Sequence, residues 1–433
     1  MFSSLDFYTT NTPFPSCFLN NRVVAVDSKK KVLTYQSSGS DKDRFTLGYA
    51  VIVLDVGSVT RCPVDLSQIG TSCTLTRPLA TMMQQISAAE KTLLERQLAV
   101  GAPVEVVEPA RVVVVGAGVA GVEVILSLEA RFSKAGVRAS YTLVGKLREA
   151  AFGSAAMVTS VGQELTSRGI KVLPDQRVLS GKGRGLLSLQ DTDGTLSALP
   201  FNFLVLATGA AAPTWLAKAT NLETDAKGFL LVRDTMASPT SEWVFAAGDC
   251  CSFNRLGESG LARESKRPGV YATREAPVII SNILEMLKAA VDPIYKPQLQ
   301  SFHSEEDFVS MVATGKGTAI GAKFGLTFQG KWVWCLKDWI DRNWMTRFRT
   351  GREEVNKDTT RFADPVSYAR SSPSPLSSRP DSRNHSEHTS LESLYGSTAH
   401  KDDEDDFADQ WVALNNMTSA DSINHKGPTT EVH

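Results

Sequence analysis

A glycine-rich turn between a buried strand and a helix is the feature that most constrains how this chain folds. Residues 111–115 read RVVVV, a β-branched run typical of a buried parallel strand. Residues 116–121 read GAGVAG, and the stretch 119–131 has the apolar spacing of a helix. The sequence therefore predicts a βαβ unit over about residues 110–143, within a mixed α/β fold.

The three glycines of this turn each have a separate task. Gly116 permits the tight turn, Gly118 lets a phosphate approach the backbone, and Gly121 allows the helix to pack closely on the sheet. The helix N-terminus adds free N–H groups and the positive end of its dipole. We therefore expect the turn to hold the pyrophosphate of a dinucleotide.

The second strand of the unit, Tyr141–Val144, ends without the acid that usually bonds the ribose 2′-hydroxyl. Gly145 follows it instead, with Lys146 and Arg148 close by. These cations would suit a 2′-phosphate, but surface lysines and arginines are common. The sequence leaves NADH and NADPH as equal alternatives.

Two later motifs repeat the pattern of a strand that ends in a glycine. Residues 204–209 read LVLATG, and residues 243–249 read WVFAAGD. The first ends at Thr208 and Gly209. In the second, Gly248 would allow a cofactor to come close and Asp249 could accept hydrogen bonds from a ribityl chain. Each motif is weak alone, but their order after the first glycine turn is strong evidence for a cofactor-binding protein.

Further elements are expected on both sides of this unit. We predict strands at 22–27, 31–35, 49–56, 171–173 and 203–207, and helices at 81–98 and 152–168.

Composition excludes several classes of function. With 46 basic and 47 acidic residues, the net charge of −1 gives no argument for a nucleic-acid partner. The six cysteines form no C-x-x-C pair, so neither a zinc site nor a redox dithiol is expected, and Cys250-Cys251 is interpreted as packing. Five of the six histidines follow residue 384, so no metal site and no histidine catalysis are predicted. The longest apolar run, 112–128, contains three glycines and Glu123 and does not read as a transmembrane segment.

The order GAGVAGVE, LATG and VFAAGDC resembles that of the two-dinucleotide-fold flavoproteins of the pyridine nucleotide-disulfide oxidoreductase superfamily. Without a dithiol, the chain is most similar to the branch of type II NADH dehydrogenases and apoptosis-inducing-factor-like reductases. Residues 302–348 resemble more specifically the flavoprotein module that some organisms fuse to selenophosphate synthase. The resemblance covers about residues 18–350 and implies a glutathione-reductase-like α/β fold with FAD and NAD(P)H as cofactors.

The resemblance also implies roles for individual residues. Gly116, Gly118 and Gly121 would bind the nicotinamide dinucleotide. Glu123 resembles the family's acid near the nicotinamide, the alternative being an ordinary glutamate on a helix face. The remaining cofactor-binding candidates are Thr208, Gly209, Gly248, Asp249 and Arg274.

Arg274 lies in the segment 267–277, which begins the helix that faces the flavin in the family. Many relatives carry Gln where this chain has Glu275, so the polarity expected of the pocket differs.

The N-terminal part departs from the family pattern. Relatives begin with their own strand and G-x-G-x-x-G turn for FAD, and no such motif precedes residue 100. The segment that ends in Asp55-Val56-Gly57-Ser58 resembles instead the end of the first FAD segment. The fold is therefore expected to be N-terminally incomplete, and we predict weak or no flavin binding by the chain as given.

The motifs and the resemblance together imply five regions in the chain. We expect a residual part of the FAD-binding domain at 1–105, an NAD(P)H-binding Rossmann-like domain at 106–212 and the second part of the FAD-binding domain at 213–300. A small Trp-rich α+β cap at 301–365 and an acidic tail at 366–433 follow. The tail is predicted to be disordered, because its apolar residues are too sparse to offset the entropy of ordering.

Four tryptophans fall within thirteen residues, at 332, 334, 339 and 344, interleaved with cations. On a helix, Leu336, Trp339, Ile340 and Trp344 would share a face. Such a segment, 331–349, could lie in a membrane interface, as the resembling C-terminal region of type II dehydrogenases does. A packed cap over the flavin domain is the favoured alternative.

The function expected from these features is that of an FAD-dependent NAD(P)H oxidoreductase, which passes hydride from nicotinamide to flavin and electrons to a quinone-like or other acceptor. The alternative is a regulatory or remnant module that binds NAD(P)H and no longer holds FAD. A selenium-linked redox role rests on the family resemblance alone. The acceptor, the oligomeric state and the location are not determined by the sequence; the location is left open between the cytoplasm and the periphery of an organelle membrane.

Overall fold

The computed structural model describes residues 19–37, 43–65, 69, 72–99, 107–181, 185–253, 269–303, 309–323 and 325–346. Within these ranges the fold is mixed α/β, as expected. The chain up to Trp344 groups as one compact unit. The tail predicted at 366–433 lies outside the described residues.

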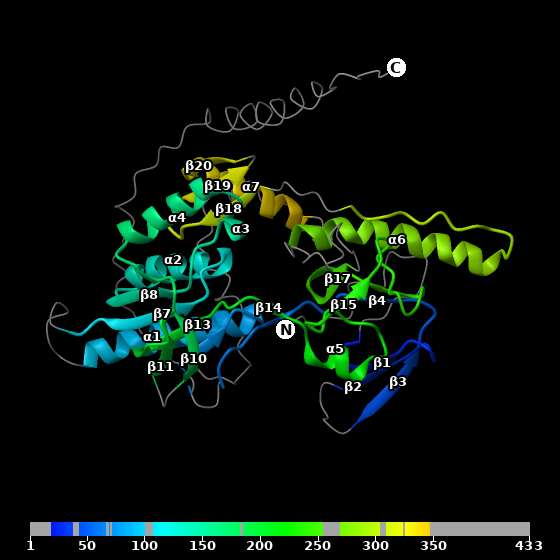
Figure 1. The fold of residues 1–433 in the computed structure, drawn as a ribbon, viewed down its shortest axis with the longest axis horizontal. Coiled ribbons are helices and arrows are strands. Elements are labelled where there is room, and N and C mark those ends of the chain that lie inside the picture. Colours follow the sequence, from blue (N-terminus) through cyan, green and yellow to red (C-terminus); the bar gives the residue numbers. More distant parts are fainter. Residues whose placement is uncertain are drawn as a thin grey trace, which may run out of the picture. The chain divides into compact units, whose positions relative to one another are not determined.

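A five-stranded parallel sheet carries the predicted βαβ unit (Figure 1). Its order is β6 (Cys73–Leu75), β13 (Phe203–Leu206), β7 (Ala110–Val115), β8 (Ala139–Val144) and β9 (Lys171–Leu173). Every neighbouring pair is parallel, and β7 and β8 are paired along their whole length. The strand predicted at 111–115 therefore lies at the centre of the sheet.

Successive side chains of each strand point to opposite faces of the sheet, and each face has its own hydrophobic core. On one face, Val112 and Val114 pack with helices α1 (Leu79–Ala99), α2 (Val119–Lys134) and α4 (Ala155–Ser167). On the other face, Val113 and Val115 pack with an antiparallel sheet of β10 (Arg177–Gly181), β11 (Leu186–Gln190) and β12 (Leu196–Pro200). Both faces of β7 are covered, which explains why its sequence is apolar without alternation.

A second group of elements surrounds a separate core. Two short parallel strands, β4 (Ile52–Leu54) and β16 (Val244–Ala246), pair with each other, and so do β15 (Leu230–Val232) and β17 (Cys251–Phe253). Helix α6 (Gly269–Val291) and helix α5 (Thr214–Ala219) contribute buried residues to this core.

An antiparallel sheet and a short crossover complete this part. The sheet consists of β1 (Asn21–Asp27), β2 (Val32–Ser37) and β3 (Arg44–Gly48). Strand β5 (Val59–Thr60) pairs with β14 (Ala210–Ala211), which directly follows the end of the five-stranded sheet. The chain thus crosses between the two groups of elements at β5 and β14.

The C-terminal elements pack on the helical face of the five-stranded sheet. They are β18 (Ser310–Ala313), β19 (Ala319–Lys323), β20 (Leu326–Gly330) and helix α7 (Lys331–Thr346). Val312 and Ile320 belong to the same core as α2 and α4. The expected small α+β cap therefore packs on the predicted βαβ unit.

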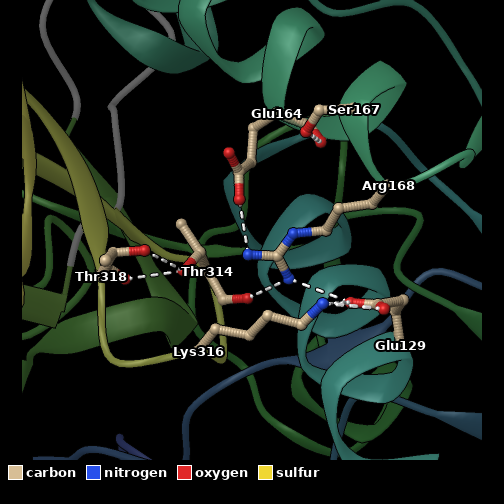
Figure 2. Close-up of polar contacts among 7 residues, drawn as sticks. All are labelled: Glu129, Glu164, Ser167, Arg168, Thr314, Lys316 and Thr318. Carbon is tan, nitrogen blue, oxygen red and sulfur yellow. Dashed lines mark hydrogen bonds and ion pairs between the residues drawn. The ribbon is translucent and has the colours of Figure 1, made fainter. Parts of the chain in front are cut away.

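A buried arginine joins these elements (Figure 2). Nη1 of Arg168 donates to Oε2 of Glu129 on α2 (3.1 Å) and to the backbone oxygen of Thr314 (2.7 Å), while its Nη2 donates to Glu164 on α4. Lys316 forms a second ion pair with Glu129 at 3.0 Å. The side chain of Arg168 is only 8% exposed, so its charge is neutralised inside the protein. The β18–β19 turn is thereby tied to both helices.

Most predicted elements are confirmed, and two are wrong in extent. The helix expected at 152–168 begins later, at Ala155, because the short helix α3 (Glu149–Phe152) ends at Gly153, whose φ of +89° is left-handed. Ser154 then caps α4 by accepting a hydrogen bond from the Met157 amide at 3.1 Å. The strand expected at 49–56 is also shorter, because only Ile52–Leu54 pairs with β16.

The residues expected to share one face of the Trp-rich helix α7 also differ in burial. Val333 and Leu336 of α7 are buried, whereas Trp339 is 56% exposed. Leu336 and Trp339 were expected to share a face, but the boundary between buried and exposed residues runs between them.

Candidate functional site

The predicted glycine turn lies where β7 ends and α2 begins, against the ends of two neighbouring strands. The Gly116 amide donates to the Val144 carbonyl at the end of β8 (2.8 Å). Gly116 has a φ of +111°, and a Cβ atom there would lie 2.2 Å from the backbone oxygen of Ala207. A Cβ atom on Gly121 would lie 1.7 Å from the oxygen of Gly116. Neither position accepts a side chain, because backbone from β13 and from the turn itself fills the space.

Gly118 differs from the other two glycines. It is the N-cap of α2, and no side chain caps the helix there. A Cβ atom on Gly118 would meet nothing within 4 Å. The N-terminus of a long helix therefore faces open space across a residue that has no side chain, which is the arrangement that binds a phosphate group.

Thr208 and Gly209 lie beside this turn, immediately after β13. The Thr208 hydroxyl donates to the backbone oxygen of Arg61, and the Arg61 amide donates to the Gly209 oxygen (2.9 Å). Gly209 has a φ of +93° and open space at its Cβ position. Both residues hold the segment around the crossover strand β5 in place.

Glu123 lies on α2 but turns toward the C-terminal sheet. Its Oε1 atom accepts a hydrogen bond from the Ala313 amide of β18 (2.8 Å). Burial raises the pKa of the Glu123 carboxyl, and the Ala313 amide and the nearby Lys337 partly oppose that rise. The geometry thus gives Glu123 a link to β18, and its expected place beside a nicotinamide stays a prediction.

Gly248 and Asp249 follow β16, at the same end as Asp55 follows β4. Because the two strands are parallel, their carboxyl ends meet at one edge. Gly248 has a φ of +67°, and a Cβ atom there would lie 2.7 Å from Oδ1 of Asp55. The Gly248 amide donates to Oε2 of Glu275 on α6 at 2.7 Å. The left-handed φ favours glycine at position 248, and a side chain there would also force the Asp55 carboxylate to shift.

Asp249 has two partners that the sequence did not suggest. Its Oδ2 atom accepts a hydrogen bond from the Ser58 hydroxyl (2.8 Å) and forms an ion pair with Nη2 of Arg77 (3.0 Å). Ser58 follows β4, so its position after a strand was a usable signal. Arg77 lies 172 positions from Asp249 and carries no motif.

Two carboxyl groups at this edge have raised pKa values. Glu275 is 3% exposed, and burial raises the pKa of its carboxyl, while the Gly248 amide lowers it and Asp55 and Asp249 raise it further. Partial burial and the neighbouring Asp249 raise the pKa of Asp55. Arg274 lies beside Glu275 in α6 and is exposed. Residues 254–268, including Arg267, lie outside the described part of the chain.

The cysteine pair next to Asp249 is packed in the core. Cys250 and Cys251 are both buried, and burial raises the pKa of the Cys250 thiol to about 11. Such a thiol is not nucleophilic near neutral pH. The interpretation of this pair as packing is consistent with the structure.

The described residues show neither a membrane-spanning helix nor a metal-binding cluster. None of their helices is long and apolar enough to cross a membrane. Their His, Cys, Asp and Glu side chains form no group of three that could hold a metal ion.

The residues at both edges fit dinucleotide cofactors. At Gly118 the open helix N-terminus fits a diphosphate. At β4 and β16, Asp249 can accept hydrogen bonds from the hydroxyls of a ribityl chain, and Arg77 supplies a positive charge for a diphosphate. Asp249 and Arg77 are paired with each other, so a flavin would have to replace that contact.

Comparison with known proteins agrees with this arrangement. A model of the family described as pyridine nucleotide-disulphide oxidoreductase matches residues 15–275. No curated protein matches the chain.

Solved structures share the fold. The sulfide:quinone oxidoreductase from the hyperthermophilic bacterium Aquifex aeolicus aligns with a TM-score of 0.58 and 15% identity, over 76% of this chain and 75% of its own. The structure of NDH2 from Plasmodium falciparum in complex with NADH aligns with a TM-score of 0.59 and 14% identity, over 76% of this chain and 81% of its own.

Proposed function

Because the chain belongs to the pyridine nucleotide-disulphide oxidoreductase family, we propose that it is an FAD-dependent NAD(P)H oxidoreductase. The observation that carries this proposal is the glycine turn at 116–121, with its interlocked Gly116 and Gly121 and its open Gly118. Family membership supports FAD and NAD(P)H as the cofactors. We assign the NAD(P)H-binding domain to residues 106–212 and the flavin-binding parts to 1–105 and 213–300.

In this proposal the nucleotide diphosphate binds at the N-terminus of α2. Gly118 lets the phosphates approach, and Gly209 keeps the space beside the turn open. The rest of the five-stranded sheet fixes the helix, because the Gly116 amide is bonded to the end of β8. The protein's task is to hold and orient the nicotinamide and to exclude water.

The flavin would be held by the groups at the ends of β4 and β16. Asp249, with Ser58 beside it, would bind the ribityl hydroxyls, and Arg77 would face the diphosphate. When bound, FAD supplies the redox chemistry: it accepts a hydride from the nicotinamide and passes electrons on. Arg274 is the candidate on α6 for contact near the flavin.

We propose a quinone as the electron acceptor. Two solved structures of the same fold are a sulfide:quinone oxidoreductase and NDH2, and the sequence motifs resemble the type II NADH dehydrogenase branch. The similarity of residues 302–348 to the module fused to selenophosphate synthase is a finer proposal within that branch. A quinone dissolves in membranes, so the exposed Trp339 on α7 supports peripheral membrane contact through 331–349.

Glu123 is proposed to act near the nicotinamide. It lies two positions after Gly121 on α2, and its raised pKa would let it hold a proton at higher pH than an exposed carboxyl. Its bond to the Ala313 amide supports the alternative, a glutamate that positions the C-terminal sheet.

One titration tests the oxidoreductase proposal. Purified chain is incubated with excess FAD, desalted and scanned for flavin absorbance, and NADH or NADPH is then added without oxygen. The proposal predicts that retained flavin is bleached by a nicotinamide and recovers its colour when a soluble quinone is added. Retained flavin that no nicotinamide bleaches would contradict it.

A second function is favoured by one observation. The Gly248 amide and the Asp249 carboxylate both have protein partners, Glu275 for the first and Ser58 and Arg77 for the second. A chain with these pairs undisturbed would be an NAD(P)H-binding module without flavin. It would bind the nicotinamide nucleotide in the same experiment and retain no flavin.

A further inference from the structure

We infer that the dinucleotide bound at the glycine turn is NADP(H) rather than NAD(H), with Arg148 and Lys146 meeting its 2′-phosphate. This inference rests on the proposed function, since it needs a dinucleotide at that turn. It goes further in naming which nicotinamide the site selects and which residues select it.

The end of β8 is the part of the site that would distinguish NADP(H) from NAD(H). β8 lies next to β7 with Val144 opposite Val115, so the residue after Val144 lies beside the glycine turn. Its amide is fixed as well, because Gly145 donates to the Leu173 carbonyl at 2.8 Å. In a βαβ nucleotide-binding unit, this strand end faces the ribose next to the adenine, whose 2′-position distinguishes the two cofactors.

A carboxylate is sterically excluded from this strand end. Gly145 has a φ of +137°, which side-chain-bearing residues rarely adopt. A Cβ atom there would lie 2.9 Å from the amide nitrogen and 3.2 Å from the Cβ atom of Ala117, inside the glycine turn. An acid at 145 could not be accommodated without moving that turn. The group that commonly binds the 2′-hydroxyl of NAD and repels a 2′-phosphate therefore has no place at this position.

Two cationic side chains follow Gly145 in the sequence. Lys146 and Arg148 are both exposed, and they flank Leu147 in the segment between β8 and α3. Among the described residues, the Arg148 side chain makes no ion pair or hydrogen bond. A guanidinium group matches a phosphate with two parallel hydrogen bonds, and an ammonium group adds a second positive charge.

The nearest acid competes only weakly. Lys146 is 3.8 Å from Oδ1 of Asp175, and the two side chains are 59% and 53% exposed. An exposed pair of this kind contributes at most about 1 kcal/mol. A phosphate that carries nearly two negative charges would displace Asp175 from Lys146. Asp175 and the exposed Glu149, which directly follows Arg148, are the acids of this region that could bond the ribose of NADH instead.

Binding of the oxidised cofactors tests the inference without any need for flavin. NADP⁺ and NAD⁺ are titrated separately into the full chain by calorimetry. We expect NADP⁺ to bind at least about tenfold more tightly, and the double variant Lys146→Ala with Arg148→Ala to lose that advantage while its affinity for NAD⁺ is unchanged. Lys171→Ala is the matched control, because Lys171 is an exposed cation on the neighbouring edge strand β9, level with Thr142 rather than with the strand end at Val144. It should leave both affinities unchanged.

The experiment distinguishes a failure of this inference from a failure of the proposed function. If NAD⁺ binds as tightly as NADP⁺ or more tightly, or if the double variant keeps the preference, this inference is overturned and the proposed function stands. If neither nucleotide binds, the proposed function fails and this inference fails with it.

Discussion

At the scale of single residues, the three glycines of the first turn are not equivalent. Gly121 is enclosed by the backbone of Gly116, whereas Gly118 has open space at its Cβ position. The same substitution should therefore act on folding at one position and on ligand binding at the other.

Replacement of each glycine by alanine separates these roles. Gly118→Ala should fold normally and weaken binding of NADP⁺ or NAD⁺ by about tenfold, because its methyl group enters the space of the diphosphate. Gly121→Ala should lower the melting temperature, because its methyl group overlaps the Gly116 oxygen. Calorimetric titration and thermal unfolding measure the two effects.

Gly162→Ala is the control, since this glycine lies inside α4 with only Leu147 at 4.0 Å and alanine is the better helix former there. Unchanged nucleotide binding by a folded Gly118→Ala protein would contradict the assignment of the open position to the diphosphate.

The buried Glu275 predicts a pH-dependent stability. Because the folded protein raises the pKa of this carboxyl above its ordinary value of 4.5, the folded state holds its proton more tightly than the unfolded chain does. Its contribution to stability is therefore lost as pH rises from about 4.5 through the folded pKa.

Glu275→Gln removes this titration and keeps an oxygen that can accept the Gly248 amide hydrogen. We expect the variant to melt at a higher temperature than the parent at pH 7–8, with the difference closing toward pH 4.5. Glu242→Gln, at an exposed position, should show no such dependence. A constant difference between Glu275→Gln and the parent at every pH would refute the explanation.

At the scale of elements, α2 connects the glycine turn at 116–121 to the C-terminal sheet. Its first residue follows Gly118, and farther along it Glu123 accepts a hydrogen bond from β18 and Glu129 binds Arg168 and Lys316. The two cations on Glu129 differ in burial, since 8% of the Arg168 side chain is exposed and 48% of that of Lys316. Only the buried one should matter strongly for stability.

Arg168→Met should therefore destabilise the protein by about 3 kcal/mol, because it leaves Glu129 and the Thr314 carbonyl without a buried partner (Figure 2). Lys316→Met should cost less than about 1 kcal/mol, since its ion pair is largely solvated. Urea unfolding of the two variants side by side gives the comparison. Equal losses would show that burial of the arginine does not set its contribution.

What the sequence could predict differs between elements for physical reasons. β7 and α2 were predicted correctly, because a β-branched run, three glycines and a helical period are local signals. The break at Gly153 and Ser154 was missed, because apolar spacing continues across it while a left-handed glycine and a capping serine interrupt the helix. The strand at 49–56 was predicted too long, because pairing with β16 alone decides its length.

In the candidate site, too, local motifs were predictable and contacts between distant residues were not. Gly116, Gly118 and Gly121 lie together in the structure as their spacing predicts. The pairing of Asp249 with Arg77 joins residues that are distant in the chain, and it depends on the crossover at β5 and β14, which no local pattern specifies. Glu123 was found by its spacing, but its bond to Ala313 depends on where the C-terminal sheet packs.

At the scale of the whole molecule, contact with a membrane would depend on α7. Val333 and Leu336 fix the inner face of this helix, and Trp339 projects outward. Trp339→Ala should lower the affinity for vesicles of anionic phospholipid by about tenfold, because an indole ring prefers the membrane interface. Co-sedimentation measures the bound fraction.

Leu326→Ala provides the control, since Leu326 of β20 is also apolar and is 71% exposed. It should leave sedimentation unchanged. Equal sedimentation of the parent and the Trp339→Ala protein would exclude this helix as the membrane contact and favour its role as a packed cap.

The β18–β19 turn has a consequence for motion. A Cβ atom on Gly315 would lie 2.9 Å from the Cα atom of Ser127 and 3.1 Å from the backbone oxygen of Leu126, so the turn touches the backbone of α2 directly. Two backbones in such contact, held also by Arg168, cannot slide past each other without breaking both the contact and the buried ion pair. The C-terminal sheet and α2 should therefore move as one rigid piece. Any opening that admits or releases a substrate has to come from segments other than this pair.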